Sequence, residues 1–153
     1  MILIDTNILL YATVGGFEEH ARARTFLDDA ISGDVQHCLC WVSVFEYLRA
    51  VTHPKLLRPT ALPLKKAVEN IEGLLAQPRI SRIDPGPRHL EIFSGICDEA
   101  APVAGNFVFD CRIAAIMREH GVDRIATRDT SFRRIPGITV VNPLAASPES
   151  ETP

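Results

Sequence analysis

The sequence predicts an α/β protein, a three-layer α/β/α sandwich with a mainly parallel central sheet. Short apolar stretches alternate along the chain with longer amphipathic stretches of helical periodicity. The apolar stretches contain few polar residues, as expected for strands that helices cover on both faces. At 153 residues, 46% of them hydrophobic and 23% charged, the chain can bury the core of a single domain.

The first half of the chain predicts two strands and three helices before a connector. A strand over 1–4 leads into a short helix over 6–12, which the pair at 15–16, both glycine, brings to an end. The remaining elements in this half are a helix over 20–31, a strand over 35–41, a helix over 43–51 and a proline-containing connector over 52–63.

The second half repeats the alternation of helices and strands. Gly121 is expected to stop the helix before it, since glycine readily adopts the left-handed backbone at a helix end. In order, the predicted elements are a helix over 64–76, a strand over 80–83, a turn over 84–87, helices over 89–99 and 107–120, and strands over 124–127 and 138–141. The domain is expected to span 1–143, and 144–153, rich in Pro, Ser and Glu, to form a flexible tail.

Composition excludes several classes of protein. No apolar run approaches the roughly 20 residues of a membrane span, and residues 1–5 lack the basic segment of an export signal, so a cytoplasmic location is expected. The formal charge of −3 argues against a general polyanion-binding surface. No second Cys or His pair completes a zinc site with Cys38 and Cys40, and together with Cys97 and Cys111 they are expected to be free buried thiols.

Four carboxylates lie where apolar elements begin or end. Asp5 and Asp129 follow strands, and Glu46 and Asp110 lie early in helices that follow strands. In a parallel sheet these positions meet at the carboxyl edge, where ligands bind. Because a lone buried carboxylate costs several kcal/mol, such acids usually converge on a partner or a metal. The four acids therefore predict a site for Mg²⁺ or Mn²⁺.

Each acid also has a structural interpretation. Asp5 could cap the helix that follows it, and Asp129 could form a turn. Ser43 and Glu46 match a capping box, in which Glu46 would only cap its helix. Asp110 shares a helical face with apolar residues, which disfavours an ordinary surface position. The joint occurrence at one sheet edge favours the functional interpretation.

Motifs in a fixed order carry a resemblance to a known family. They are Ile-Asp-Thr-Asn at 4–7, Ser-x-x-Glu at 43–46, Asp110 with Ile113-Ala114-Ala115 and Glu119-His120-Gly121, and Thr127-x-Asp129-x-x-Phe132 before Pro136-Gly137. From the first residue to about 143 the chain resembles a PIN domain, and more narrowly the VapC-type ribonuclease toxins of bacterial toxin–antitoxin pairs. Cys111 stands where the family often has alanine, and the connector over 54–63 is long.

The resemblance implies a PIN-like fold and divalent-metal-dependent cleavage of RNA. One or two Mg²⁺ or Mn²⁺ ions would be held by Asp5, Glu46, Asp110 and Asp129, directly or through water, and would activate a water for in-line attack. Thr6, Asn7, Ser43 and Thr127 could orient the carboxylates or the metal-bound waters, although Thr6 and Ser43 could equally cap helices. Candidates for phosphate contacts are Arg112, Arg128, Arg133 and Arg134, with ordinary solvated or ion-paired arginines as the alternative.

The resemblance also implies partners: an RNA substrate, a cognate VapB-like antitoxin and a second copy in a homodimer. The competing hypothesis is a non-catalytic PIN-like module that binds RNA or protein, which a missing acid would favour; all four are present. An aspartyl phosphatase is disfavoured because Asn7 occupies the place of the second aspartate and no lysine lies near a strand end.

Overall fold

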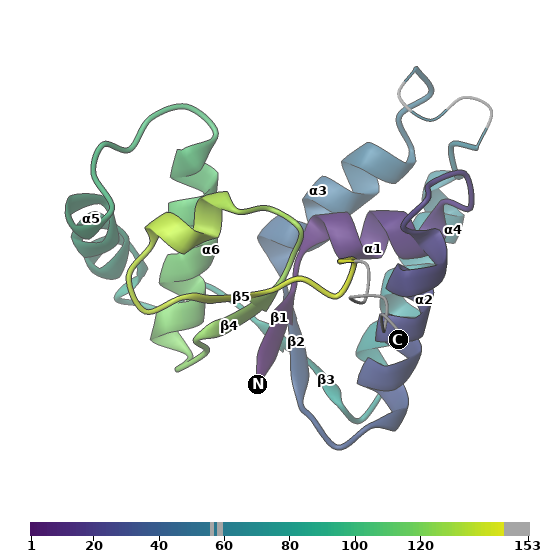
Figure 1. The fold of residues 1–153 in the computed structure, drawn as a ribbon, viewed down its shortest axis with the longest axis horizontal. Coiled ribbons are helices and arrows are strands. Elements are labelled where there is room, and N and C mark those ends of the chain that lie inside the picture. Colours follow the sequence, from purple (N-terminus) through teal and green to yellow (C-terminus); the bar gives the residue numbers. More distant parts are fainter. Residues whose placement is uncertain (56, 58–59, 146–153) are drawn as a thin grey trace, which may run out of the picture.

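The computed structural model describes residues 1–55, 57 and 60–145 of the chain. Its centre is a sheet of five strands in the order β3-β2-β1-β4-β5, and all neighbouring strands are parallel (Figure 1). The strands are β1 (Ile2–Ile4), β2 (His37–Cys40), β3 (Ile80–Ile83), β4 (Arg124–Ala126) and β5 (Thr139–Val141). The predicted α/β fold with a parallel sheet is confirmed.

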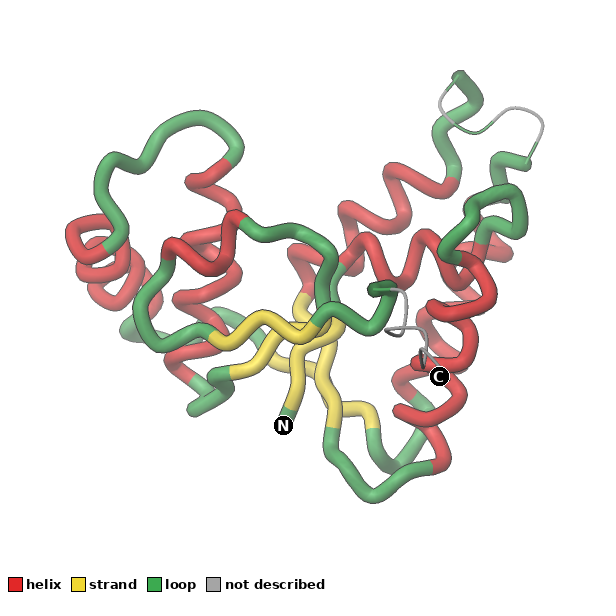
Figure 2. Tube along the Cα trace, viewed as in Figure 1, coloured by secondary structure: helices red, strands yellow, loops and turns green. Residues whose placement is uncertain are grey.

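Helices cover both faces of this sheet, as Figure 2 shows by colour. One group consists of α1 (Thr6–Thr13), α2 (His20–Ser32), α3 (Trp41–Val51) and α4 (Leu64–Leu75). The other consists of α5 (His89–Glu99), α6 (Phe107–Glu119) and the short 3₁₀ helix η1 (Ser131–Arg134). A hydrophobic core lies on each face of the sheet, and alternate residues of β1 pack into each. Ile2 and Ile4 pack with the first group of helices, and Leu3 packs with the second.

Local sequence explains where several helices begin and end. Asp5 is the N-cap of α1 and accepts a hydrogen bond from the Thr6 N–H, so the predicted capping role of Asp5 is confirmed. Gly121 follows α6 with a φ of +67°, the left-handed conformation expected at its end. These two ends place Asp5 at the carboxyl edge of β1 and fix the length of α6.

The predicted capping box at 43–46 is wrong. β2 passes directly into α3, so the helix begins at Trp41, two residues before its predicted start, and Cys40 is the N-cap without a side-chain capping bond. The Ser43 Oγ instead lies 3.3 Å from the Cys40 Sγ in the core. Glu46 therefore has no capping role. The 3₁₀ helix η1 was not predicted either.

Other expectations concern the cysteines, the membrane and the tail. Cys38 and Cys40 lie on one face of β2 against the α6 side, and burial raises the pKa of the Cys38 thiol to about 12, so it stays protonated. No described helix combines the length and apolar composition that a membrane span requires. Of the predicted tail, 146–153 lie outside the described residues. Leu144 is 4% exposed and packs in the core on the side of α1 to α4.

Candidate active site at the carboxyl edge of the sheet

Asp5 is buried at the carboxyl edge of β1, with 6% of its surface exposed. Its Oδ1 accepts a hydrogen bond of 2.7 Å from the Thr6 backbone N–H. Its Oδ2 accepts from the Asn7 Nδ2 and from the Thr127 Oγ1, each at 2.6 Å. Thr127 follows β4, the strand beside β1, so the two neighbouring strands fix this carboxylate from both sides.

Glu46 reaches the same edge from α3. Its Oε2 accepts a hydrogen bond of 3.0 Å from the Thr6 Oγ1, which also lies 3.2 Å from the Ser43 carbonyl oxygen. Thr6 is thus bonded through its backbone to Asp5 and through its hydroxyl to Glu46. Of the two interpretations of Thr6, orientation of a carboxylate is the one that these contacts fit.

Asp110 and Asp129 are joined by Ser131, a residue that the sequence analysis missed. The Ser131 Oγ donates to the Asp110 Oδ2 at 2.7 Å, and its backbone N–H donates to the Asp129 Oδ1 at 2.8 Å. The second bond forms an Asx turn, in which an aspartate accepts from the N–H two residues later. The Asp-x-Ser spacing could have indicated the turn, but its contact with α6 depends on the tertiary fold.

The acids at this edge influence one another's pKa values. The pKa of Asp5 is raised to about 6, chiefly by burial and in smaller part by the negative charges of Glu46 and Asp110, against the lowering effect of its hydrogen bonds. Burial also raises the pKa of Asp110, with additional contributions from Asp129 and Glu46. None of the ion pairs within the described part of the chain includes one of these acids. Among the described residues, no Lys or Arg forms an ion pair with this negatively charged cluster.

The donor chemistry of this cluster fits a hard divalent cation. Among the described residues, the Glu46 Oε1, the Asp110 Oδ1 and the Asp129 Oδ2 accept no hydrogen bond, so each of these three acids has an oxygen free for a metal or a water. In the same part of the chain, no three Asp, Glu, His or Cys side chains are close enough together to form a ready-made metal site.

The predicted phosphate-contacting arginines occupy different environments. Arg128 pairs with Glu19 and lies over the Tyr11 ring, and Arg134 stacks 3.9 Å above the Phe107 ring and donates to the Pro102 carbonyl. These contacts fit the structural alternative for both. Arg112 and Arg133 are exposed and form no ion pair with any described residue.

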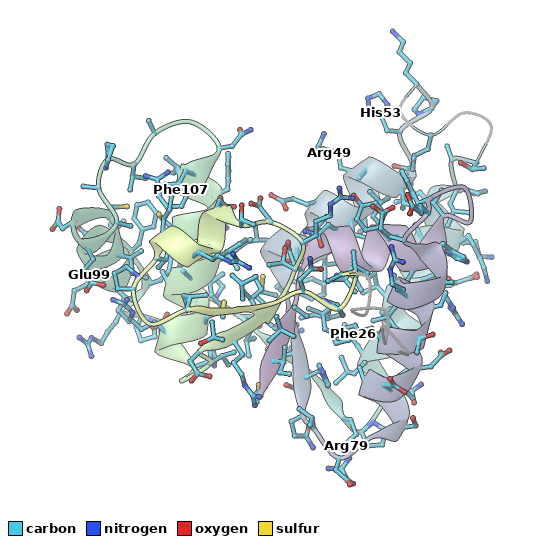
Figure 3. All side chains as sticks on the ribbon, in the orientation of Figure 1. Phe26, Arg49, His53, Arg79, Glu99 and Phe107 are labelled. Carbon is cyan, nitrogen blue, oxygen red and sulfur yellow. The ribbon has the colours of Figure 1, made fainter. Side chains whose placement is uncertain are left out.

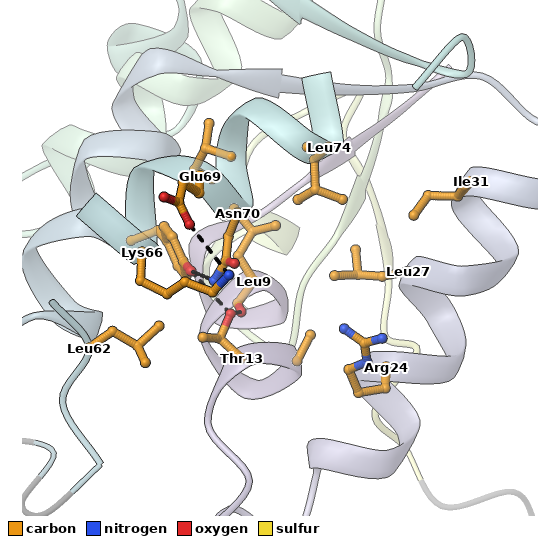
Figure 4. A pocket seen from close by; sticks show the side chains of 14 residues that line it. Leu9, Thr13, Arg24, Leu27, Ile31, Leu62, Lys66, Glu69, Asn70 and Leu74 are labelled. Atoms are coloured by element: carbon orange, nitrogen blue, oxygen red, sulfur yellow. Dashed lines mark hydrogen bonds and ion pairs between the residues drawn. The ribbon is translucent and has the colours of Figure 1, made fainter. Parts of the chain in front are cut away.

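A cavity of about 490 Å³ lies away from the acids, between α1, α2 and α4. Figure 4 shows Leu27 and Ile31 of α2 facing Leu74 of α4 across it, with the ion pair of Lys66 and Glu69 at one side. None of the four acids lines this cavity, so it is not the candidate active site.

Comparison with known proteins identifies the family of this chain. Residues 2–138 match the family described as PIN domain. This chain belongs to the PIN-domain family. It is 33% identical over 144 residues to ribonuclease VapC33 of Mycobacterium tuberculosis, covering 94% of this chain and 99% of that relative. Within the PIN-domain family it is thus a ribonuclease of the VapC type, the toxin class of VapBC toxin–antitoxin systems.

Solved structures agree on the fold of this PIN domain. The crystal structure of VapC20 from M. tuberculosis, described as a toxin that cleaves the sarcin–ricin loop, aligns with a TM-score of 0.64 at 15% identity, covering 87% of this chain and 93% of that one. A toxin–antitoxin complex from Klebsiella pneumoniae aligns with a TM-score of 0.58 at 22% identity, covering 94% of this chain and 98% of that one. At these identities the likeness concerns the fold.

The raised pKa of Asp5 leads to a prediction about stability. Because the folded state holds the Asp5 proton more tightly than the unfolded state, the unfolding free energy of metal-free protein should fall as the pH rises from about 4 to about 6. A pKa of about 6 against the usual 3.8 corresponds to a loss of about 3 kcal/mol. The unfolding free energies of wild type and Asp5→Asn, measured by urea unfolding in EDTA, give this contribution as their difference. A difference that is constant between these pH values would show that Asp5 titrates normally.

Proposed function

We propose that this PIN domain is a Mg²⁺- or Mn²⁺-dependent endoribonuclease that cleaves phosphodiester bonds in single-stranded or loop RNA as the toxin of a VapBC pair. The observation that carries the proposal is the group of four carboxylates, Asp5, Glu46, Asp110 and Asp129, at one sheet edge, where no described Lys or Arg pairs with them. Its relatives, the VapC ribonucleases, supply the substrate class.

The side chains of the site have separable tasks in this proposal. One or two bound cations would lower the pKa of a coordinated water and stabilise the charge that develops on the phosphate. Asp5 is held by Thr6, Asn7 and Thr127, so it is already oriented as a ligand. Thr6 orients Glu46, and Ser131 sets the spacing between Asp110 and Asp129.

Metal dependence is the direct test of this function. Purified protein should cleave an unstructured RNA in Mg²⁺ or Mn²⁺ and stop in EDTA, and either ion should raise the melting temperature because binding relieves the carboxylate repulsion. With water as the nucleophile and the 3′ oxygen as the leaving group, the products carry 5′-phosphate and 3′-hydroxyl ends. Cleavage that continues in EDTA, or that leaves 2′,3′-cyclic phosphates, would overturn the mechanism, provided that Asp110→Asn purified in parallel excludes a contaminating nuclease.

The proposal includes the partners that the family implies. An antitoxin of the VapB type would cover the acidic edge, and a basic side chain is the natural group to fill a cluster of carboxylates. The toxin–antitoxin complex from K. pneumoniae, whose fold this chain resembles, supports such a partner. We expect the pair to act in the cytoplasm and the chain to form a homodimer.

A further inference from the structure

Arg128 lies between two residues of the candidate site, Thr127 and Asp129. Its backbone N–H donates to the Asn7 Oδ1 at 3.3 Å, and the Asn7 Nδ2 donates to the Asp5 Oδ2 and to the Thr127 Oγ1. The Asp129 N–H donates to the same Thr127 Oγ1 at 2.9 Å. The backbone at Arg128 therefore connects the exit of β4 to the first turn of α1, the two segments that carry Asp129 and Asp5.

The Arg128 side chain contacts the same helix one turn further along. Its Nη1 donates to the Tyr11 hydroxyl at 3.3 Å, and the guanidinium carbon lies 5.8 Å from the centre of the Tyr11 ring. Tyr11 follows Asn7 by four residues, so the two side chains lie on one face of α1. Residue 128 is thus attached to that face at two points, by its backbone at Asn7 and by its side chain at Tyr11.

Glu19 completes this support from the connection between α1 and α2. It stands directly before α2, forms no side-chain capping bond to that helix, and pairs with the Arg128 guanidinium. The Tyr11 ring is held in turn by Phe17, whose ring lies 5.0 Å away at 84°, an edge-to-face contact. The same connection therefore supplies both the ion-pair partner of Arg128 and the ring that packs on Tyr11.

The positive charge of Arg128 is paired with Glu19 and not with the site. Arg128 directly precedes Asp129, yet among the described residues no ion pair joins its guanidinium to any of the four acids. An exposed ion pair adds little to the stability of a domain. The contribution of this pair therefore lies in where it holds residue 128.

We propose that Arg128 is a positioning residue of this site. By attaching residues 127–129 to α1, it keeps Asn7 bonded to Asp5 and fixes Asp129 relative to Asp5. The two acids come from different elements, and residues that orient the ligands of a metal govern how well the ligands bind it. This inference rests on the proposed metal-dependent function and adds how two of its ligands are kept in register.

A phosphate of the RNA is the other partner that an exposed arginine at this edge could bind. Loss of a positioning residue acts through the metal, so it lowers kcat and weakens metal binding at unchanged KM. Loss of a phosphate contact raises KM and lowers the slope of log affinity against log salt by about 0.7. Removing Glu19 weakens the support in the first case, but frees Arg128 for RNA and lowers KM in the second.

Arg128→Gln should lower kcat for RNA cleavage about tenfold at unchanged KM, and should weaken Mn²⁺ binding, measured by calorimetry without RNA, about tenfold. Glu19→Ala should act in the same direction by about threefold, since the contacts of Arg128 with Tyr11 and Asn7 remain. The double variant should cleave no more slowly than Arg128→Gln alone, because both changes remove the same ion pair. Arg128→Lys, which can still pair with Glu19, should recover part of the rate.

The matched control is Arg118→Gln. Arg118 also pairs with a glutamate, Glu99, and donates to a backbone carbonyl, that of Pro136, so its loss removes a similar set of contacts. Figure 3 shows Glu99 in the half of the molecule built on α5 and α6, away from α1. Arg118→Gln should lower the melting temperature at least as much as Arg128→Gln does, and should leave kcat and Mn²⁺ affinity unchanged.

The possible outcomes separate this inference from the proposed function. Weaker Mn²⁺ binding by Arg128→Gln and Glu19→Ala supports the positioning role even if the wild type fails to cleave RNA. Metal-dependent cleavage by the wild type, with both variants equal to it in kcat and Mn²⁺ affinity, overturns the role and leaves the function standing. A raised KM for Arg128→Gln with a lowered KM for Glu19→Ala assigns Arg128 to the substrate instead. A wild type that neither binds Mn²⁺ nor cleaves RNA overturns both.

Discussion

Asp110→Asn should cleave RNA at least about 100-fold more slowly than wild type in Mg²⁺, with its fold intact. Loss of one charged ligand removes several kcal/mol of transition-state stabilisation, and each 1.36 kcal/mol is a factor of ten in rate. The fold should survive because asparagine has the same shape and can still accept the hydrogen bond from the Ser131 Oγ. Metal-free Asp110→Asn should even melt at a higher temperature, since burial and two neighbouring acids disfavour the charged form.

The matched control is Asp123→Asn, at an exposed aspartate directly before β4, at the edge opposite the acids. It should cleave like wild type. Ser131→Ala should fall between the two, about tenfold slower, because Ser131 only orients Asp110 and Asp129. Wild-type turnover by folded Asp110→Asn would place the active site elsewhere.

Expression of the wild-type chain alone should arrest bacterial growth, whereas equal amounts of soluble Asp5→Asn should not. Unrestrained RNA cleavage harms the cell, and Asp5 is the most deeply buried of the four acids and lies at the centre of the hydrogen bonds that join β1 and β4. Colony counts after induction measure the effect, and we expect a difference of several orders of magnitude.

Coexpression tests the partner in the same assay. A short neighbouring reading frame should encode a protein that copurifies with this chain, restores growth and suppresses cleavage in vitro. The control is Asp123→Asn, which should remain toxic without that partner. Harmless expression of active wild type, without such a neighbour, would indicate a PIN nuclease outside a toxin–antitoxin pair.

Hydrophobic periodicity and the residues that end elements were sufficient to predict the order of helices and strands. Apolar stretches such as that of β1 have residues for both cores, Ile2 and Ile4 on one face and Leu3 on the other, and only a sheet covered on both sides accommodates that pattern. Element ends were less accurate where no local signal marks them. The junction of β2 and α3 has no loop, so Trp41 was predicted as strand although it begins the helix.

The sequence by itself predicted the four acids of the candidate site, because each follows a strand or begins a helix at the same edge of a parallel sheet. Only the tertiary structure decided how they are held. The Thr6 hydroxyl meets Glu46 across 40 positions of sequence, Thr127 meets Asp5 across 122, and Ser131 joins Asp110 to Asp129. Hydrogen bonds of 2.6 to 3.0 Å between such distant residues depend on the packing of whole elements, whereas strand ends and helix starts depend on neighbouring residues, which a sequence reveals.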